Sequence, residues 1–157
     1  MRLSFQEHLT GSTDCGFLAT HLQGGGCEGG NLAVDVLIAE DEPSILESLD
    51  FILRRAGWSI QSVTDGEAAL SAVRRLQPRI VVLDVMLPKR SGFEVLKQIR
   101  SDNATRELPV LVLTAKGQAQ DRRTAEELGA DSFITKPYAN VDVVNEVRRL
   151  LGEELAQ

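Results

Sequence analysis

Five short apolar runs alternate with five segments in which apolar residues recur at every third or fourth position, from about Val34 to Leu151. The short runs predict strands, and the recurring spacing predicts amphipathic helices with one buried face. The predicted strands are Val34–Ala39, Trp58–Val63, Ile80–Asp84, Pro109–Leu113 and Asp131–Thr135. The predicted helices follow Pro43-Ser44, Asp65-Gly66 and Ser91-Gly92, then span Gln118–Leu128, and the last one carries Val144, Val147 and Leu151.

This order predicts an α/β fold. Strands that alternate with helices form parallel βα units with right-handed crossovers. The run Ile80–Leu83 has no polar residue, as in a strand that is covered by helices on both faces. Five such strands favour a flavodoxin-like, doubly wound, five-stranded parallel sheet of order 2-1-3-4-5 with five helices. In this fold the ligand crevice lies between the first and third strands, at their carboxyl ends.

Residues 1–33 differ from the rest of the chain. They hold seven of the 13 glycines and show no sustained apolar period. Such a segment buries too little surface to offset the entropy lost on ordering, so we expect a disordered, Gly-rich leader or a non-native extension. The domain is expected to span 34–153, with a short tail at 154–157. Cys15 and Cys27 both lie in the leader and fit no standard zinc spacing.

Net charge and hydropathy argue against two classes of function, the binding of duplex nucleic acid and insertion into a membrane. The net charge is −6 and the pI is about 5.0, which argues against binding of duplex nucleic acid. The sequence has no apolar run of the roughly 20 residues that span a bilayer and no signal-peptide core, so we expect a cytoplasmic protein without membrane contact.

Polar residues follow four of the five predicted strands. Glu40-Asp41 follows the first strand, and Asp84 ends the third, while Thr114 and Lys136 follow the fourth and fifth. Parallel strands bring these residues to one sheet edge, where three close carboxylates would repel one another and favour a bound cation. An all-oxygen site of this kind suits Mg²⁺, which often works with phosphate groups. The set predicts a metal-assisted phosphoryl site with a carboxylate nucleophile.

From about Val36 to Leu151 the chain resembles the receiver domain of bacterial response regulators, the phospho-accepting modules of two-component signalling, as in the stand-alone chemotaxis regulators. The matching stretches are Leu37–Pro43, Asp65-Gly66, Val82–Pro88, Ser91-Gly92, Leu113–Ala115 and Gly129–Pro137.

The resemblance implies a role for each site residue. Asp84 would be the phosphoacceptor, with the Thr114 hydroxyl and Lys136 on the phosphoryl oxygens. The metal site would consist of Glu40 (through water), Asp41, Asp84 and the backbone carbonyl of Met86. The Lys136-Pro137 bond is expected to be cis. Phe133 takes the aromatic switch position and would turn inward when Thr114 moves, which would remodel the face of the fourth helix, fifth strand and fifth helix.

The resemblance also implies partners. A sensor histidine kinase or a histidine phosphotransfer protein would supply the phosphoryl group, and a downstream protein would bind the switched face. Only six residues follow Leu151, so we expect a stand-alone receiver, monomeric or weakly dimeric, with no direct DNA binding. A receiver fragment of a larger regulator is the alternative. The protein would be no enzyme, since it promotes only its own phosphorylation and dephosphorylation.

Two other classes share parts of this pattern. Haloacid-dehalogenase-like phosphohydrolases use an aspartyl phosphate, but they need an acid/base Asp two residues after the nucleophile, where this chain has Met86. A flavodoxin-like FMN binder needs a first loop that cradles phosphate, and Glu40-Asp41-Glu42 would repel it.

Overall fold

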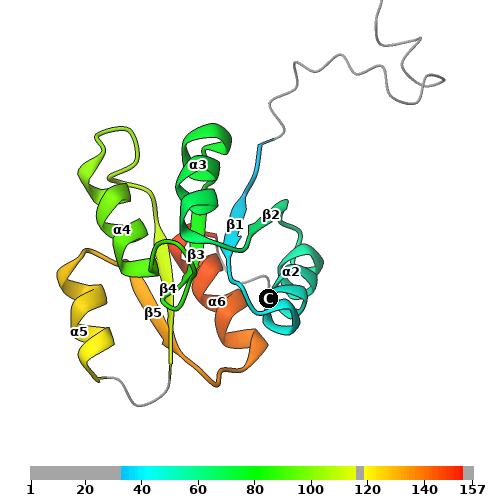
Figure 1. Ribbon diagram of the computed structural model, residues 1–157. Helices are drawn as coiled ribbons and strands as arrows, with labels where there is room; N and C mark the ends of the chain where they lie inside the picture. The colour runs from blue at the N-terminus through cyan, green and yellow to red at the C-terminus, as the bar shows by residue number, and fades with distance from the viewer. Residues whose placement is uncertain (1–32, 116–118, 154–157) are drawn as a thin grey trace, which may run out of the picture. The chain divides into compact units, whose positions relative to one another are not determined.

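The computed structural model describes residues 33–115 and 119–153 (Figure 1). The predicted leader, apart from Ala33, and the predicted tail lie outside these residues. The elements in chain order are β1 (Val36–Ala39), α2 (Pro43–Arg55), β2 (Ile60–Val63), α3 (Gly66–Leu76), β3 (Ile80–Asp84), α4 (Gly92–Ser101), β4 (Val110–Thr114), α5 (Ala119–Glu127), β5 (Ser132–Thr135) and α6 (Asn140–Leu150).

The five strands form one parallel sheet of order β2-β1-β3-β4-β5, which confirms the predicted flavodoxin-like fold. In the register, Ala39 of β1 pairs with Leu83 of β3, and Asp84 pairs with Leu113 of β4. The strand ends that carry the candidate residues are therefore aligned at one edge. Strands β1, β3 and β4 are buried along their whole length.

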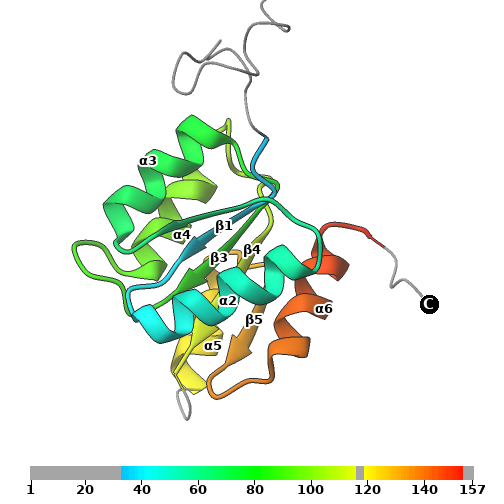
Figure 2. The same ribbon diagram turned by 90° about the vertical axis from the view of Figure 1, so that its right-hand side faces the viewer.

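Each face of the sheet has its own apolar core. One core joins the sheet to α3, α4 and α5, through side chains such as Val73, Leu96 and Ala125. The other joins it to α2 and α6, through Leu53 and Val147 among others. Figures 1 and 2 show the sheet between these two groups of helices. Because helices cover both faces of the sheet, the residues of β3 before Asp84 are all buried and apolar.

Residues that favour helix starts and helix ends stand at the boundaries of α2, α3 and α4. Pro43 stands in the first turn of α2, and Gly57 after its end has a φ of 108°. The Asp65 side chain caps α3 by accepting the Ala68 N–H. Ser91 and Glu94 form a capping box at the start of α4, so the helix begins directly behind the loop that leaves Asp84.

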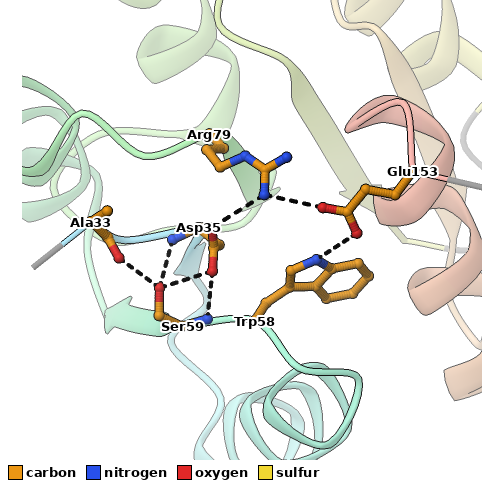
Figure 3. Close-up of polar contacts among 6 residues, drawn as sticks. All are labelled: Ala33, Asp35, Trp58, Ser59, Arg79 and Glu153. Atoms are coloured by element: carbon orange, nitrogen blue, oxygen red, sulfur yellow. Dashed lines mark hydrogen bonds and ion pairs between the residues drawn. The ribbon is translucent and has the colours of Figure 1, made fainter.

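A polar network occupies the opposite, amino-terminal edge of the sheet (Figure 3). Arg79, just before β3, bonds both Asp35 and Glu153, and Asp35 accepts the Ser59 N–H. The Trp58 indole N–H donates to the second Glu153 oxygen at 3.0 Å. Strand β2 begins at Ile60, so Trp58 and Ser59 precede it, whereas the sequence pattern predicted a strand from Trp58. The network joins the residue before β1 to Glu153, three residues after the end of α6.

None of the described helices is long and apolar enough to cross a membrane.

Candidate functional site

The candidate residues meet at the carboxyl edge of the sheet. Asp84 is the last residue of β3, Glu40 directly follows β1, and Thr114 is the last residue of β4. Lys136 directly follows β5, and its backbone N–H donates to the Thr114 carbonyl at 2.7 Å. The peptide bond between Lys136 and Pro137 is cis, as the resemblance implied.

Three carboxylates form an acidic cluster at this edge. Glu40, Asp41 and Asp84 each offer one oxygen, and these oxygens all lie within 4.8 Å of one another. Glu40 is 1% and Asp84 3% exposed, whereas Asp41 is open to solvent. The donors are all oxygens, and one side is accessible to water, which is the chemistry that Mg²⁺ prefers. The cluster is consistent with a magnesium site.

Lys136 neutralises part of this negative charge. Its ammonium nitrogen lies 2.9 Å from Glu40 Oε2 and 3.1 Å from Asp84 Oδ2. Burial raises the pKa of Glu40, and the neighbouring Asp84 raises it further, although the hydrogen bond from Lys136 acts in the opposite direction. Burial alone would lower the pKa of Lys136, but its two carboxylate partners raise it above the ordinary value. Lys136 is therefore a fixed cation beside the Asp84 carboxylate.

The loop after β3 fixes the Asp84 side chain. Oδ1 accepts the backbone N–H of Met86 at 3.1 Å, while Met86 itself is 71% exposed. Gly92 packs directly against the backbone behind Asp84, because a Cβ at Gly92 would lie 2.2 Å from the Asp84 carbonyl oxygen. The Gly92 N–H also donates to the Val85 carbonyl. The sequence pattern identified Gly92 only as a helix start. The sequence signal for the close backbone contact was the glycine itself, because most other residues are more favourable than glycine in the first turn of a helix.

The predicted switch residues lie on neighbouring strands. Thr114 is 2% exposed and stands one position beyond Leu113, the register partner of Asp84. Phe133, in the middle of β5, is half-buried against the core that includes α5. The guanidinium of Arg122 lies 4.5 Å from the centre of the Phe133 ring. Sequence reasoning did not foresee this contact.

An open groove of about 540 Å³ borders the site next to Lys136. Its walls come from the first turns of α2 and from the loop between β5 and α6. Ile45, Pro137 and Tyr138 give it apolar surface, and burial raises the pKa of the Tyr138 hydroxyl.

Two curated relatives illustrate the similarity. The chain is 46% identical over 118 residues to the "Probable transcriptional regulatory protein TcrX" of Mycobacterium tuberculosis, a match that covers 75% of this chain and 50% of that protein. It is 40% identical over 116 residues to the "DNA-binding dual master transcriptional regulator RpaA" of Synechocystis, covering 74% of this chain and 48% of that protein. The chain spans about half the length of the curated relatives it matches.

These relatives correct one expectation. The sequence argument expected no direct DNA binding, and this was wrong, because RpaA is named as a DNA-binding regulator and TcrX as a transcriptional regulatory protein. That expectation rested on the net charge of −6 and on the six residues that follow Leu151. That charge describes these 157 residues alone, so it gives no information on the nucleic-acid contacts of proteins about twice as long.

Two further comparisons identify the family. The receiver domain of a sensor histidine kinase from Pseudomonas aeruginosa, solved with a magnesium ion in its active-site cleft, superposes with a TM-score of 0.71 at 25% identity, covering 77% of this chain and 99% of that domain. The model of the response regulator receiver domain matches residues 36–148. The chain therefore belongs to the receiver domain family of two-component response regulators.

Proposed function

We propose that Asp84 accepts a phosphoryl group from the phosphohistidine of a sensor histidine kinase or a histidine phosphotransfer protein. The observation that carries this proposal is the placement of the Asp84 side chain, 5% exposed, within an acidic cluster and beside a fixed cation. A carboxylate oxygen of Asp84 forms the new P–O bond while the P–N bond to the donor imidazole breaks. The bonding electrons leave with the imidazole nitrogen.

Lys136 and Thr114 take the roles that stabilise the transferred group. The Lys136 ammonium, already 3.1 Å from Asp84 Oδ2, stays beside the phosphoryl oxygens as their charge accumulates. The Thr114 hydroxyl donates to one of these oxygens from the end of β4. The Met86 N–H on Oδ1 holds the carboxylate in one orientation before the donor arrives.

The acidic cluster is proposed to hold Mg²⁺. Asp41 and Asp84 would bind it directly, the Met86 carbonyl would be a third ligand, and Glu40 would bind one of its waters. When bound, the ion would neutralise negative charge on the transferring oxygens. Glu40 itself holds two groups in place, since Oε1 accepts the Glu42 N–H and Oε2 accepts from Lys136.

The signal is proposed to leave through the face of α5, β5 and α6. Movement of the Thr114 hydroxyl towards the phosphoryl group would open space beside β4, and the half-buried Phe133 ring would turn into it. A protein partner would then bind the altered face. The chemistry of this chain acts on Asp84 alone, with no turnover of another substrate. We also propose a cytoplasmic location and a domain that spans 34–153.

The test is intact mass spectrometry after incubation with acetyl phosphate, with and without Mg²⁺. We expect one phosphoryl adduct that needs both Mg²⁺ and Asp84, and its loss in Asp84→Asn. Asp142→Asn, at an exposed position of α6, is the matched control and should form the adduct at the native rate. An adduct that persists in Asp84→Asn would overturn the assignment, and steady hydrolysis of phosphate esters would indicate a phosphohydrolase instead.

A further inference from the structure

A second groove is lined by residues of α3, of α4 and of the loop after β3. Helices α3 and α4 cover the face of the sheet that α2 and α6 do not cover (Figure 1). The groove has a volume of about 560 Å³. Arg74 and Arg75 from the last turns of α3 line one end, and Arg90 from the loop after β3 lines the other. Leu70 supplies apolar surface, and Ser71 and Gln98 add polar groups. One carboxylate, Glu67, also lines the groove beside Arg90.

The three guanidinium groups of this arginine groove have no close partners. Arg74 lies 3.9 Å from Asp102, and Arg90 lies 3.9 Å from Glu67, distances too long for a charge-assisted hydrogen bond. Arg75 has no ion-pair partner within residues 33–115 and 119–153, and none of the three guanidinium groups donates a hydrogen bond to a described residue. By contrast, Arg79 and Arg100 each bind a carboxylate at 3.2 Å or less.

The groove is also a basic region in an acidic chain. Its charged lining consists of three arginines, Arg74, Arg75 and Arg90, and one carboxylate, Glu67. The chain as a whole carries 17 Lys and Arg against 23 Asp and Glu. The basic side chains are exposed, with 62% of the Arg74 side chain and 45% of the Arg90 side chain open to solvent. An anionic ligand would meet net positive charge in this groove, on a chain whose overall charge is −6.

We propose that the arginine groove binds a short acidic segment of a partner protein, in which carboxylates flank an apolar residue. The carboxylates would take bidentate hydrogen bonds from Arg74, Arg75 and Arg90, and the apolar residue would lie on Leu70. Helix α3 has 11 residues and so is about 16 Å long, which matches about five residues of extended chain. Arg90 lies six residues after Asp84, so the bound segment would contact the loop that follows the phosphoacceptor.

The size of the basic region favours such a segment over duplex DNA. A duplex carries one negative charge for about every 1.7 Å of its axis and extends well beyond a groove of this length. Its flanking phosphates would face the acidic remainder of the chain. A segment with three or four carboxylates places all of its charge within reach of the three arginines.

The test is fluorescence anisotropy with a labelled heptapeptide in which four acidic residues surround one leucine. We expect saturable binding that weakens with salt, and a loss of about tenfold or more in affinity in Arg74→Gln/Arg75→Gln, since each charge-assisted pair contributes on the order of 1.5 kcal/mol. The matched control is Arg55→Gln/Arg123→Gln, which removes the same charge from exposed positions on α2 and α5 and should change affinity less than about twofold.

Three results would overturn the proposal. The first is no binding of the peptide to the native protein at millimolar concentration. The second is an equal loss of affinity in the groove variant and the control variant, because this would mean that net charge alone acts. The third is tighter binding of a short DNA duplex than of the peptide, with the same dependence on Arg74 and Arg75. The folding control is phosphoryl acceptance from acetyl phosphate, measured on every variant. It does not involve the peptide, so it separates a loss of folding from a loss of peptide binding.

Discussion

The Lys136 ammonium nitrogen lies 3.1 Å from Oδ2 of Asp84, and the side chain of Lys136 is 22% exposed while that of Asp84 is 5% exposed. The same nitrogen lies 2.9 Å from Glu40. One cation thus serves two buried carboxylates from two different strands. Removing it leaves two buried carboxylates without their cationic partner, which costs more than the loss of an exposed ion pair.

We therefore predict that Lys136→Met lowers the free energy of unfolding by about 2 kcal/mol at pH 7 without Mg²⁺. Mg²⁺ should restore most of this loss, because it supplies the missing positive charge. Urea unfolding measures both effects. The control is Lys89→Met, which breaks a 3.6 Å pair with Asp65 in which 60% of the lysine side chain is exposed, and it should cost less than about 1 kcal/mol. Equal losses in the two variants would contradict the argument.

The raised pKa of Glu40 predicts a pH dependence of stability. Burial keeps a proton on folded Glu40 at pH values where the unfolded chain, with an ordinary carboxyl pKa near 4.5, has lost it. The folded state then binds more protons, so the free energy of unfolding falls as the pH rises from 4.5 through the folded pKa. Glu40→Gln should flatten this part of the curve, measured as urea midpoints without Mg²⁺, and the exposed Glu67→Gln should not. Identical curves for the native protein and Glu40→Gln would exclude this explanation.

The sequence predicted the sheet order and the shared edge because both depend on local patterns. An unbroken apolar strand that ends on Asp84 must be central, and parallel strands must end on the same side. Glu40, Asp84, Thr114 and Lys136 could be placed together without knowing any contact between them.

Contacts between distant residues could not be predicted in this way. The bond from Trp58 to Glu153 joins residues 95 positions apart, and no periodicity encodes it. Gly92 was interpreted as a helix start, although its essential property is the missing Cβ against the Asp84 backbone. The arginine groove likewise depends on how α3 packs beside α4. DNA binding by longer relatives could not follow from the charge of this chain alone.

Gly92→Ala should disturb the site through backbone contact. Its new Cβ would lie 2.2 Å from the Asp84 carbonyl oxygen and 2.8 Å from Val85 Cα, and neither atom can rotate away. We expect a loss of about 2 kcal/mol in stability together with slower phosphoryl acceptance, measured by urea unfolding and by the rate of adduct formation. Gly57→Ala is the comparison, since no atom lies within 4 Å of its Cβ and only its φ of 108° is strained. It should lose about 1 kcal/mol and accept phosphoryl at the native rate. A native rate in Gly92→Ala would show that the Asp84 backbone tolerates the shift.

The network at the amino-terminal edge of the sheet should contribute measurably to stability. Burial alone would raise the pKa of Asp35, but hydrogen bonds from Ser59 and Arg79 lower it below its ordinary value. Asp35 therefore stabilises the fold above the unfolded pKa, and this contribution is lost as the pH falls through the folded pKa. Asp35→Asn should cost about 1 kcal/mol at pH 7 in urea unfolding. Asp50→Asn, which breaks an exposed pair with Arg54 within α2, should cost less than about 0.5 kcal/mol, and the reverse order would contradict the assignment.

Helix α5 is the element that we expect to respond to phosphorylation. Only Ala125 among its nine residues is fully buried, whereas α2 buries both Leu49 and Leu53, so α5 is held by fewer apolar contacts. Its Arg122 also lies over the Phe133 ring, and an inward turn of that ring would remove this contact. Weakly packed elements open with low free energy, so amide hydrogen exchange in α5 should become several-fold faster after phosphorylation of Asp84, while α2 stays unchanged as an internal control. Hydrogen exchange with mass spectrometry, on the native protein and on Asp84→Asn treated in the same way, measures this. Unchanged protection in α5 alongside a complete phosphoryl adduct would show that the signal leaves through another face of the domain.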